Sequence, residues 1–279
     1  MNKALIIGIN DYTLSPLKGC INDMTAIASY LIDNKVFKEN EIRLLANNRA
    51  TTYAIKQRLE WLVADIQEGD KLFFYFSGHG AQFPSRNKYG EVDGLDEVIC
   101  PYDFDWSSEK VIRDNYFVKT FARISKDVRF IWISDSCHSG DLSDTSPYYF
   151  YKYRKNKEEP YETDGQKAKF IPQPIDIFWR TMTAEKEKIQ RENPLTEKVV
   201  YLSACRSNQI ARDAKFGEIY HGAFTYFLME VLKNSSKDDN LGKIIYNARK
   251  LLNKNGFKQI PQVEGNKTLI EKTIDNIFN

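Results

Sequence analysis

Two short motifs contain the residues best suited to covalent chemistry. His79 lies in Phe76-Ser-Gly-His-Gly80, and Cys137 lies in Ser134-Asp-Ser-Cys-His-Ser-Gly140. A thiol becomes a strong nucleophile when a neighbouring base takes its proton, and an imidazole is the commonest such base. A pair of this kind can break an acyl bond through a covalent intermediate. The two motifs therefore predict a thiol hydrolase, provided that the fold brings the two side chains together.

Both motifs directly follow an apolar run of the length expected for a buried strand. Residues 71–76 precede the histidine motif, and residues 128–133 precede the cysteine motif. In an open α/β sheet, ligands bind beyond the carboxyl ends of the strands. Glycine and serine beside each residue let the backbone approach a substrate closely. Either residue alone would more often be an inert core thiol or a strand-end imidazole, but together they predict one cleft.

His79 is the best placed of the three histidines to act as the base. His138 directly follows the cysteine, and successive side chains of an extended chain diverge. His221 lies in a glycine-flanked stretch that we predict to be a loop. In the predicted reaction His79 takes the proton of Cys137 and later passes it to the leaving amine. The backbone N–H groups of Gly80 and Cys137 are expected to stabilise the oxyanion, and such donors contribute about 2.7–4 kcal/mol each.

Apolar spacing along the rest of the chain predicts strands that alternate with helices. Strands are expected at 4–9, 41–45, 71–76, 128–133 and 199–203. Helices are expected at 21–37, 51–64, 114–124, 223–233 and 241–253. Alternation of this kind is typical of βαβ units, so we predict an α/β fold with a mainly parallel sheet.

The alternation divides the chain into three segments. Residues 1–144 are predicted to form a larger catalytic segment, residues 145–197 a basic connector, and residues 198–279 a smaller segment that completes the same sheet. The connector is too long for an ordinary loop in a compact domain. It is poor in core-forming residues, so we expect it to be solvated. Its basic residues include Lys152, Arg154, Lys155, Lys157, Lys167 and Lys169.

Composition excludes several classes of partner. The net charge is only +2, so we expect neither nucleic acid nor an anionic membrane as a partner. No stretch is long and apolar enough for a signal-peptide core or a membrane span. Four cysteines without CxxC spacing indicate free thiols in a reducing compartment. These features predict a cytoplasmic location.

The motifs resemble those of the caspase-like cysteine peptidases, and among them the type I metacaspases and their bacterial relatives, the orthocaspases. The cysteine context differs from the Q-A-C-[RQG]-G signature of caspases and points to metacaspases. His79 precedes Cys137 by 58 positions, against about 50 in caspases. The matching stretches are Leu17-Lys-Gly-Cys-Ile-Asn-Asp23, Ser77-Gly-His-Gly80, Asp93-Gly-Leu-Asp-Glu97, Asp135-Ser-Cys-His-Ser-Gly140 and Ser203-Ala-Cys-Arg-Ser-Asn-Gln209.

This resemblance implies a caspase-like sheet sandwiched between helices and an acidic pocket for the side chain before the cut bond. The residues that match the pocket are Asp23, Asp135, Cys20 and Ser77. Two carboxylates in one pocket repel each other, and a guanidinium or ammonium relieves that repulsion. The resemblance therefore implies protein or peptide substrates with a basic residue before the cut bond. From the sequence alone, Asp23 could equally be a helix N-cap, and Asp135 a carboxylate that caps nearby backbone N–H groups.

An Arg/Lys-directed protease could also cut its own basic connector, so we expect self-cleavage between residues 145 and 197. The resemblance also implies a monomer, because in metacaspases additional strands cover the sheet edge through which caspases dimerise. Two alternatives stay open, a catalytically silent caspase-like binding module and an Asp-directed caspase. A nucleotide-binding protein is disfavoured, since no glycine-rich phosphate loop follows the first strand.

No cofactor is required for the predicted chemistry, but many metacaspases are activated by calcium. Hard oxygen donors suit this ion, and the candidates here are Asp93, Asp96, Asp114 and Asp144. Arg113 stands where the family pattern has a second aspartate beside Asp114. A cation at a ligand position argues against tight binding, so the sequence leaves calcium open.

Overall fold

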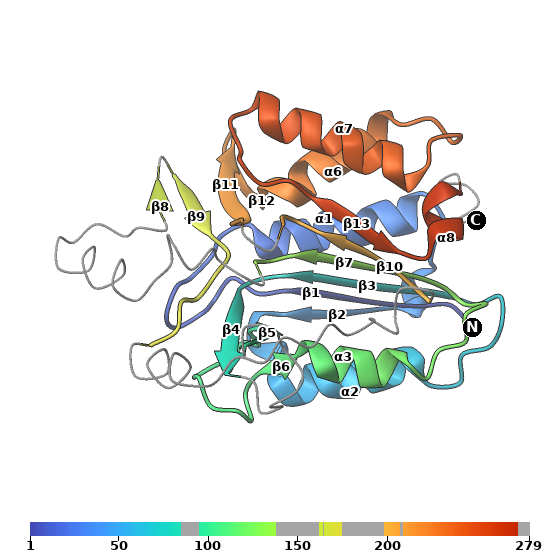
Figure 1. The fold of residues 1–279 in the computed structure, drawn as a ribbon, viewed down its shortest axis with the longest axis horizontal. Coiled ribbons are helices and arrows are strands. Elements are labelled where there is room, and N and C mark those ends of the chain that lie inside the picture. Colours follow the sequence, from blue (N-terminus) through green and yellow to red (C-terminus); the bar gives the residue numbers. More distant parts are fainter. Residues whose placement is uncertain (85–94, 138–161, 164, 175–197, 207–208, 273–279) are drawn as a thin grey trace.

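A six-stranded sheet lies at the centre of the computed structural model, in the order β13-β10-β7-β3-β1-β2 (Figure 1). All neighbouring pairs are parallel except β13, which is antiparallel to β10. The structure describes residues 1–84, 95–137, 162–163, 165–174, 198–206 and 209–272. The strands of this sheet are β1 (Lys3–Gly8), β2 (Ile42–Ala46), β3 (Lys71–Ser77), β7 (Arg129–Asp135), β10 (Val199–Ser203) and β13 (Gln262–Gly265).

Helices cover both faces of the sheet, so the predicted α/β sandwich is confirmed. Helices α2 and α3 lie on one face, and α1, α6 and α7 lie on the other (Figure 1). Within the described ranges, no helix is long and apolar enough to cross a membrane. The α-helices are α1 (Cys20–Asp33), α2 (Thr52–Val63), α3 (Asp114–Phe121), α6 (Ala223–Asn234), α7 (Leu241–Lys254) and α8 (Lys267–Glu271), with single 3₁₀ turns η1 (Glu39–Glu41) and η2 (Asn47–Arg49).

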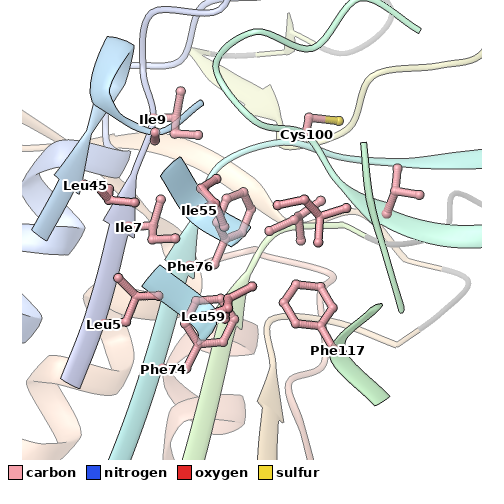
Figure 2. Packing of buried hydrophobic residues seen from close by; sticks show 14 of the residues in the cluster. Leu5, Ile7, Ile9, Leu45, Ile55, Leu59, Phe74, Phe76, Cys100 and Phe117 are labelled. Carbon is pink, nitrogen blue, oxygen red and sulfur yellow. The ribbon is translucent and has the colours of Figure 1, made fainter. Parts of the chain in front are cut away.

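Alternate residues of the central strands fill two separate cores. Ala4 and Ile6 of β1 pack in the core beneath α1, α6 and α7. Leu5 and Ile7 point the opposite way, into the core beneath α2 and α3 (Figure 2). Because both faces are buried, the strands appear in the sequence as continuous apolar runs. Burial of each such side chain stabilises the fold by about 1.5–3 kcal/mol.

Two helices show how local signals set the element boundaries. Helix α2 begins where predicted, because the Thr51 side chain accepts a hydrogen bond from the Ala54 N–H. Helix α1 ends at Asp33, short of the predicted residue 37. Lys35 has a positive φ of 59°, which turns the chain so that Val36 and Phe37 enter the core as part of a loop.

Two smaller sheets were not predicted from the sequence. One is three-stranded, in the order β4-β5-β6, and the other is four-stranded, in the order β12-β11-β9-β8. Their strands are β4 (Gly80–Pro84), β5 (Leu95–Ile99), β6 (Ile112–Arg113), β8 (Glu162–Thr163), β9 (Gln166–Ala168), β11 (Arg212–Phe216) and β12 (Ile219–Gly222).

The four-stranded sheet corrects the prediction of a wholly solvated connector. Strand β9 belongs to the connector and pairs antiparallel with β11. The residues after β9 are buried, including Lys169, Phe170 and Ile171. The prediction is wrong for this part because backbone pairing and apolar packing, rather than solvent, surround it. Lys152, Arg154, Lys155 and Lys157 lie outside the described residues.

Candidate active site

Parallel pairing of β3 with β7 brings the two sequence motifs to one edge of the sheet. Ser77 is level with Asp135 in the register, and each is the last residue of its strand. His79 and Cys137 each follow two residues later, and both are fully buried. His79 and Cys137 therefore both lie just beyond the carboxyl ends of their strands, as predicted. No hydrogen bond joins the two side chains in the part of the chain that the structure describes.

The His79 ring is held in one orientation with one nitrogen free. Its Nε2 lies 2.6 Å from the carbonyl oxygen of Ser15, which can only accept, so Nε2 carries the proton. Nδ1 is buried without a hydrogen-bond partner and keeps its lone pair. Tyr12 packs edge-on against the ring, 4.7 Å between centroids, and its hydroxyl accepts a hydrogen bond from the backbone N–H of His79. Burial lowers the pKa of His79 to about 3, so the ring is neutral.

The Cys137 thiol faces the start of β11. The Ala211 N–H donates to Cys137 Sγ at 2.7 Å, and the thiol lies 3.5 Å from the Ala211 carbonyl oxygen. Cys205, which follows the parallel neighbour β10, also lies beside it. The hydrogen bond to Cys137, together with burial, raises the pKa of the Cys205 thiol. Cys205 is therefore a protonated neighbour of the reactive sulfur.

The two predicted oxyanion donors converge on one carbonyl oxygen. The N–H groups of Gly80 and Cys137 donate to the oxygen of Lys169 at 3.1 and 3.2 Å. Gly80 is needed here for space, because a Cβ at this position would lie 1.8 Å from the Cys137 carbonyl oxygen. This pair of donors can stabilise negative charge on a carbonyl oxygen that lies between them.

The side chain of the same residue, Lys169, lies among the buried acidic groups that were expected to form the pocket. Its Nζ lies 3.0 Å from Asp135 Oδ1 and 3.3 Å from Asp23 Oδ2, and it donates to Ser77 Oγ at 2.8 Å. All three charged side chains have 0% exposure. Burial opposes the charge on Lys169, but the neighbouring Asp135, Cys20 and Asp23 raise its pKa well above the ordinary value. The pocket therefore holds a lysine in its charged form.

Backbone groups from distant parts of the chain hold the two pocket carboxylates. Asp23 accepts from Ser77 Oγ at 2.8 Å and from the Gly222 N–H at 2.9 and 3.1 Å. Asp135 Oδ2 accepts from the Thr225 N–H at 2.9 Å and from its hydroxyl at 2.6 Å. Burial raises the pKa of Asp135, with Lys169 opposing the shift. Each carboxylate is thus also held by groups other than the Lys169 ammonium.

The two aspartates differ in how they lie relative to the starts of helices α1 and α6. Helix α1 begins at Cys20 with Gly19 as its N-cap, so Asp23 lies in the first turn and is not the cap. Asp135 does cap backbone, at the start of α6, but its second oxygen faces Lys169. Cys20 is buried beside Ser77, and burial raises the pKa of its thiol. The four residues expected in the pocket therefore lie together.

The backbone around Lys169 is hydrogen-bonded on both sides, like a strand within a sheet. Residues of β9 pair with β11, and the Lys169 N–H donates to the Ala211 carbonyl at 3.0 Å. On the other side, the Ile171 N–H donates to the Gly80 carbonyl at 3.0 Å. The peptide bond between Lys169 and Phe170 thus lies between anchored backbone on both sides, with its carbonyl polarised by two donors.

Of the four calcium candidates, the structure describes Asp96 and Asp114. Asp96 is buried and forms an ion pair with Arg113, so one of its oxygens is already bound to a cation. Asp114 begins helix α3. Asp93 and Asp144 lie outside the described residues. Among the residues that the structure describes, no three His, Cys, Asp or Glu side chains are grouped to hold a metal ion.

Sequence reasoning missed several residues around the pocket. His221 is on strand β12, not in a loop, and its Nδ1 lies 3.0 Å from Asp23 Oδ1. Asp213 of β11 is a third buried carboxyl group, and burial raises its pKa to about 6. Gly222 and Thr225 bind the two aspartates. Nothing local in the sequence signals these contacts, because His221 and Asp23 are 198 residues apart. His138 lies outside the described residues.

The ends of β3 and β7 present a thiol and a neutral imidazole, the two groups that a cysteine peptidase requires. A family model for the metacaspase, peptidase C14 domain matches residues 2–146. The chain belongs to this family and is a cysteine-type endopeptidase, a hydrolase. The predicted family and enzyme class are therefore confirmed.

Individual relatives agree with this assignment. The chain is 29% identical to metacaspase-2 of Trypanosoma brucei brucei, over 96% of this chain and 74% of the relative. It is 29% identical to metacaspase-1 of Candida albicans, over 94% of this chain and 64% of the relative. A crystal structure of a Geobacter sulfurreducens protein matches in fold over 98% of both chains, with a TM-score of 0.69 and 20% identity.

Proposed function

We propose that this metacaspase cleaves peptide bonds after lysine or arginine, with Cys137 as the nucleophile and His79 as the base. The observation that carries the proposal is Lys169. Its ammonium fills the pocket between Asp23 and Asp135, and its carbonyl oxygen accepts from both oxyanion donors. Lys169 thus occupies both the acidic pocket and the position between the oxyanion donors, where the substrate residue before the cut bond would lie.

Charge supports a basic residue at this position. A unit charge pair 4 Å apart is worth about 4 kcal/mol at an effective dielectric of 20. Asp23 and Asp135 together attract an ammonium or guanidinium and repel a substrate carboxylate by similar amounts. An Asp-directed caspase would need a cation in this pocket, and the fixed groups here are carboxylates. The pocket therefore favours lysine and arginine over aspartate.

In the proposed reaction, Nδ1 of His79 takes the proton of the Cys137 thiol, since it is the nitrogen that keeps a lone pair. The thiolate attacks the substrate carbonyl, and the oxyanion is held by the N–H groups of Gly80 and Cys137. His79 then gives the proton to the leaving amine. Water, activated by the same imidazole, hydrolyses the thioester and frees the enzyme.

We also propose that the bond between Lys169 and Phe170 is the self-cleavage site in the connector. Backbone hydrogen bonds on both sides hold this bond in the cleft. The same segment excludes other peptides from the pocket, because Lys169 has 0% exposure there. The chain as described is therefore latent towards added substrates until this segment leaves the cleft.

The test uses the full chain, its Cys137→Ala and Asp135→Asn variants, and matched peptide reporters with Lys, Arg or Asp before the cut bond. We expect wild type to release a fragment that starts at Phe170, identified by mass spectrometry, and to cleave the Lys and Arg reporters once this segment has left the cleft. Both variants should lose reporter cleavage. If Asp135→Asn cleaved the Lys and Arg reporters as fast as wild type, the pocket would not determine specificity. A Cys137→Ala chain that still produces the Phe170 fragment would refute self-cleavage.

A further inference from the structure

We infer that His221 and Gly222, at the end of β12, are specificity-determining residues of the lysine pocket. Gly222 leaves the space that the ammonium occupies, and His221 is a positioning residue for Asp23. This inference rests on the proposed function, since it concerns the pocket that would receive the residue before the cut bond. Neither residue carries a recognisable sequence motif.

Gly222 lies against the charged end of the pocket. A Cβ there would be 2.3 Å from Lys169 Nζ and 2.3 Å from Asp135 Oδ2. Its φ of −62° and ψ of 128° suit any residue, so the backbone conformation does not require glycine. The missing side chain is needed for space alone. An added methyl group would take the place of the substrate ammonium.

Gly222 also supplies a donor that sets the direction of Asp23. Its N–H lies 2.9 and 3.1 Å from the two carboxylate oxygens. Asp23 Oδ2 further accepts from Ser77 Oγ and contacts Lys169 Nζ, so that oxygen faces the substrate position. Oδ1 faces away, toward His221. The carboxylate is therefore held at both ends.

His221 completes this arrangement from the solvent side. Its Nδ1 lies 3.0 Å from Asp23 Oδ1, and its side chain is 18% exposed while that of Asp23 is 0% exposed. The ring contacts the charged carboxylate of Asp23, and the ring of Tyr226 lies 5.7 Å away between centroids. No contact joins His221 to Lys169 in the described part of the chain. His221 thus acts on a substrate only through the orientation of Asp23.

The first experiment measures steady-state kinetics with the Lys reporter. His221→Leu removes the donor, and we expect KM to rise about tenfold with kcat within twofold, equivalent to about 1.4 kcal/mol of binding. His221→Asn can place an amide N–H near the position of Nδ1, and it should restore KM. Unchanged KM in His221→Leu, or failure of His221→Asn to restore it, would refute the positioning role. Wild type and Asp135→Asn in the same series report separately on the proposed function.

The second experiment does not depend on catalysis. In Cys137→Ala chains, the acylation of Lys169 by an N-hydroxysuccinimide ester is followed by mass spectrometry. We expect Gly222→Ala to expel the ammonium and to speed acylation at least tenfold. Gly242→Ala in α7 is the matched control, because its added Cβ would meet only Asn240 Oδ1, at 3.3 Å. If Lys169 were acylated no faster in Gly222→Ala than in the control, the role of Gly222 would be refuted. This result does not depend on the activity of the enzyme.

Discussion

Replacing Lys169 by methionine, in a Cys137→Ala chain, would test how the buried charges of the cleft are balanced. The Lys169 ammonium interacts with three buried carboxyl groups, those of Asp23, Asp135 and Asp213. Methionine fills a similar volume but removes the charge. Loss of one partner from a buried ion pair costs about 3–5 kcal/mol, because the other charge is left without compensation.

This free-energy loss translates into a large change in melting temperature. For a domain of 150–250 residues, about 1 kcal/mol lowers Tm by about 2–4 °C, so the expected decrease at pH 8 is about 6–20 °C. Burial already raises the pKa of Asp135, and Lys169 opposes that shift. Without Lys169 the folded-state pKa rises further, so the folded protein binds more protons than the unfolded chain. The free energy of unfolding of the Lys169→Met chain therefore falls as the pH rises through the folded-state pKa of Asp135.

The assay is differential scanning calorimetry of Lys169→Met and its parent between about pH 5 and pH 8. We expect a deficit that is largest at pH 8 and shrinks at pH 5, where the carboxyl groups take up protons. Lys258→Met is the control, because Lys258 is exposed and should change Tm little. A Tm decrease in Lys169→Met no larger than in the control, or equal at both pH values, would contradict the buried ion pairs.

Four further results are expected. Asp213→Asn should stabilise the chain by up to about 3 kcal/mol at pH 8, because burial raises the pKa of Asp213 to about 6, and the gain should vanish below about pH 4 in urea titrations. Gly80→Ala should lower kcat about 10²–10³-fold on the Lys reporter while circular dichroism stays unchanged, since its Cβ would displace the oxyanion donors. A strong calcium chelator should leave reporter cleavage unchanged, because Asp96 is already bound to Arg113; activity lost on chelation would contradict this reading. Light scattering should also give the mass of a monomer.

The central sheet and the positions of His79 and Cys137 were predictable because their signals are local. Strands buried on both faces appear as apolar runs, and parallel strands end at one edge of a sheet. The place of the reactive residues follows from those two facts. The acidic pocket was reached through resemblance, and the contacts of Asp23 and Asp135 with Lys169 agree with it.

The remaining features depend on contacts between distant residues. Strand β9 joins the four-stranded sheet by pairing with β11, more than forty positions later. Its lysines made the segment look solvated, yet the Lys169 charge is buried because Asp23 and Asp135 are buried with it. His221 was assigned to a loop because nothing beside it reveals strand β12 or the approach of Asp23. Such pairings become visible only once the tertiary structure is known.

Because Lys169 and Phe170 are both held in the cleft, cutting the bond between them does not by itself activate the enzyme. After hydrolysis the new terminal carboxylate would still lie between the oxyanion donors, with its ammonium still in the pocket. Phe170 packs in one core and Ile171 in the other, so the downstream product is retained as well. Gel electrophoresis would therefore measure the fraction of chains that are cleaved. The fraction of active enzyme would be measured by how many Cys137 thiols react with an added inhibitor.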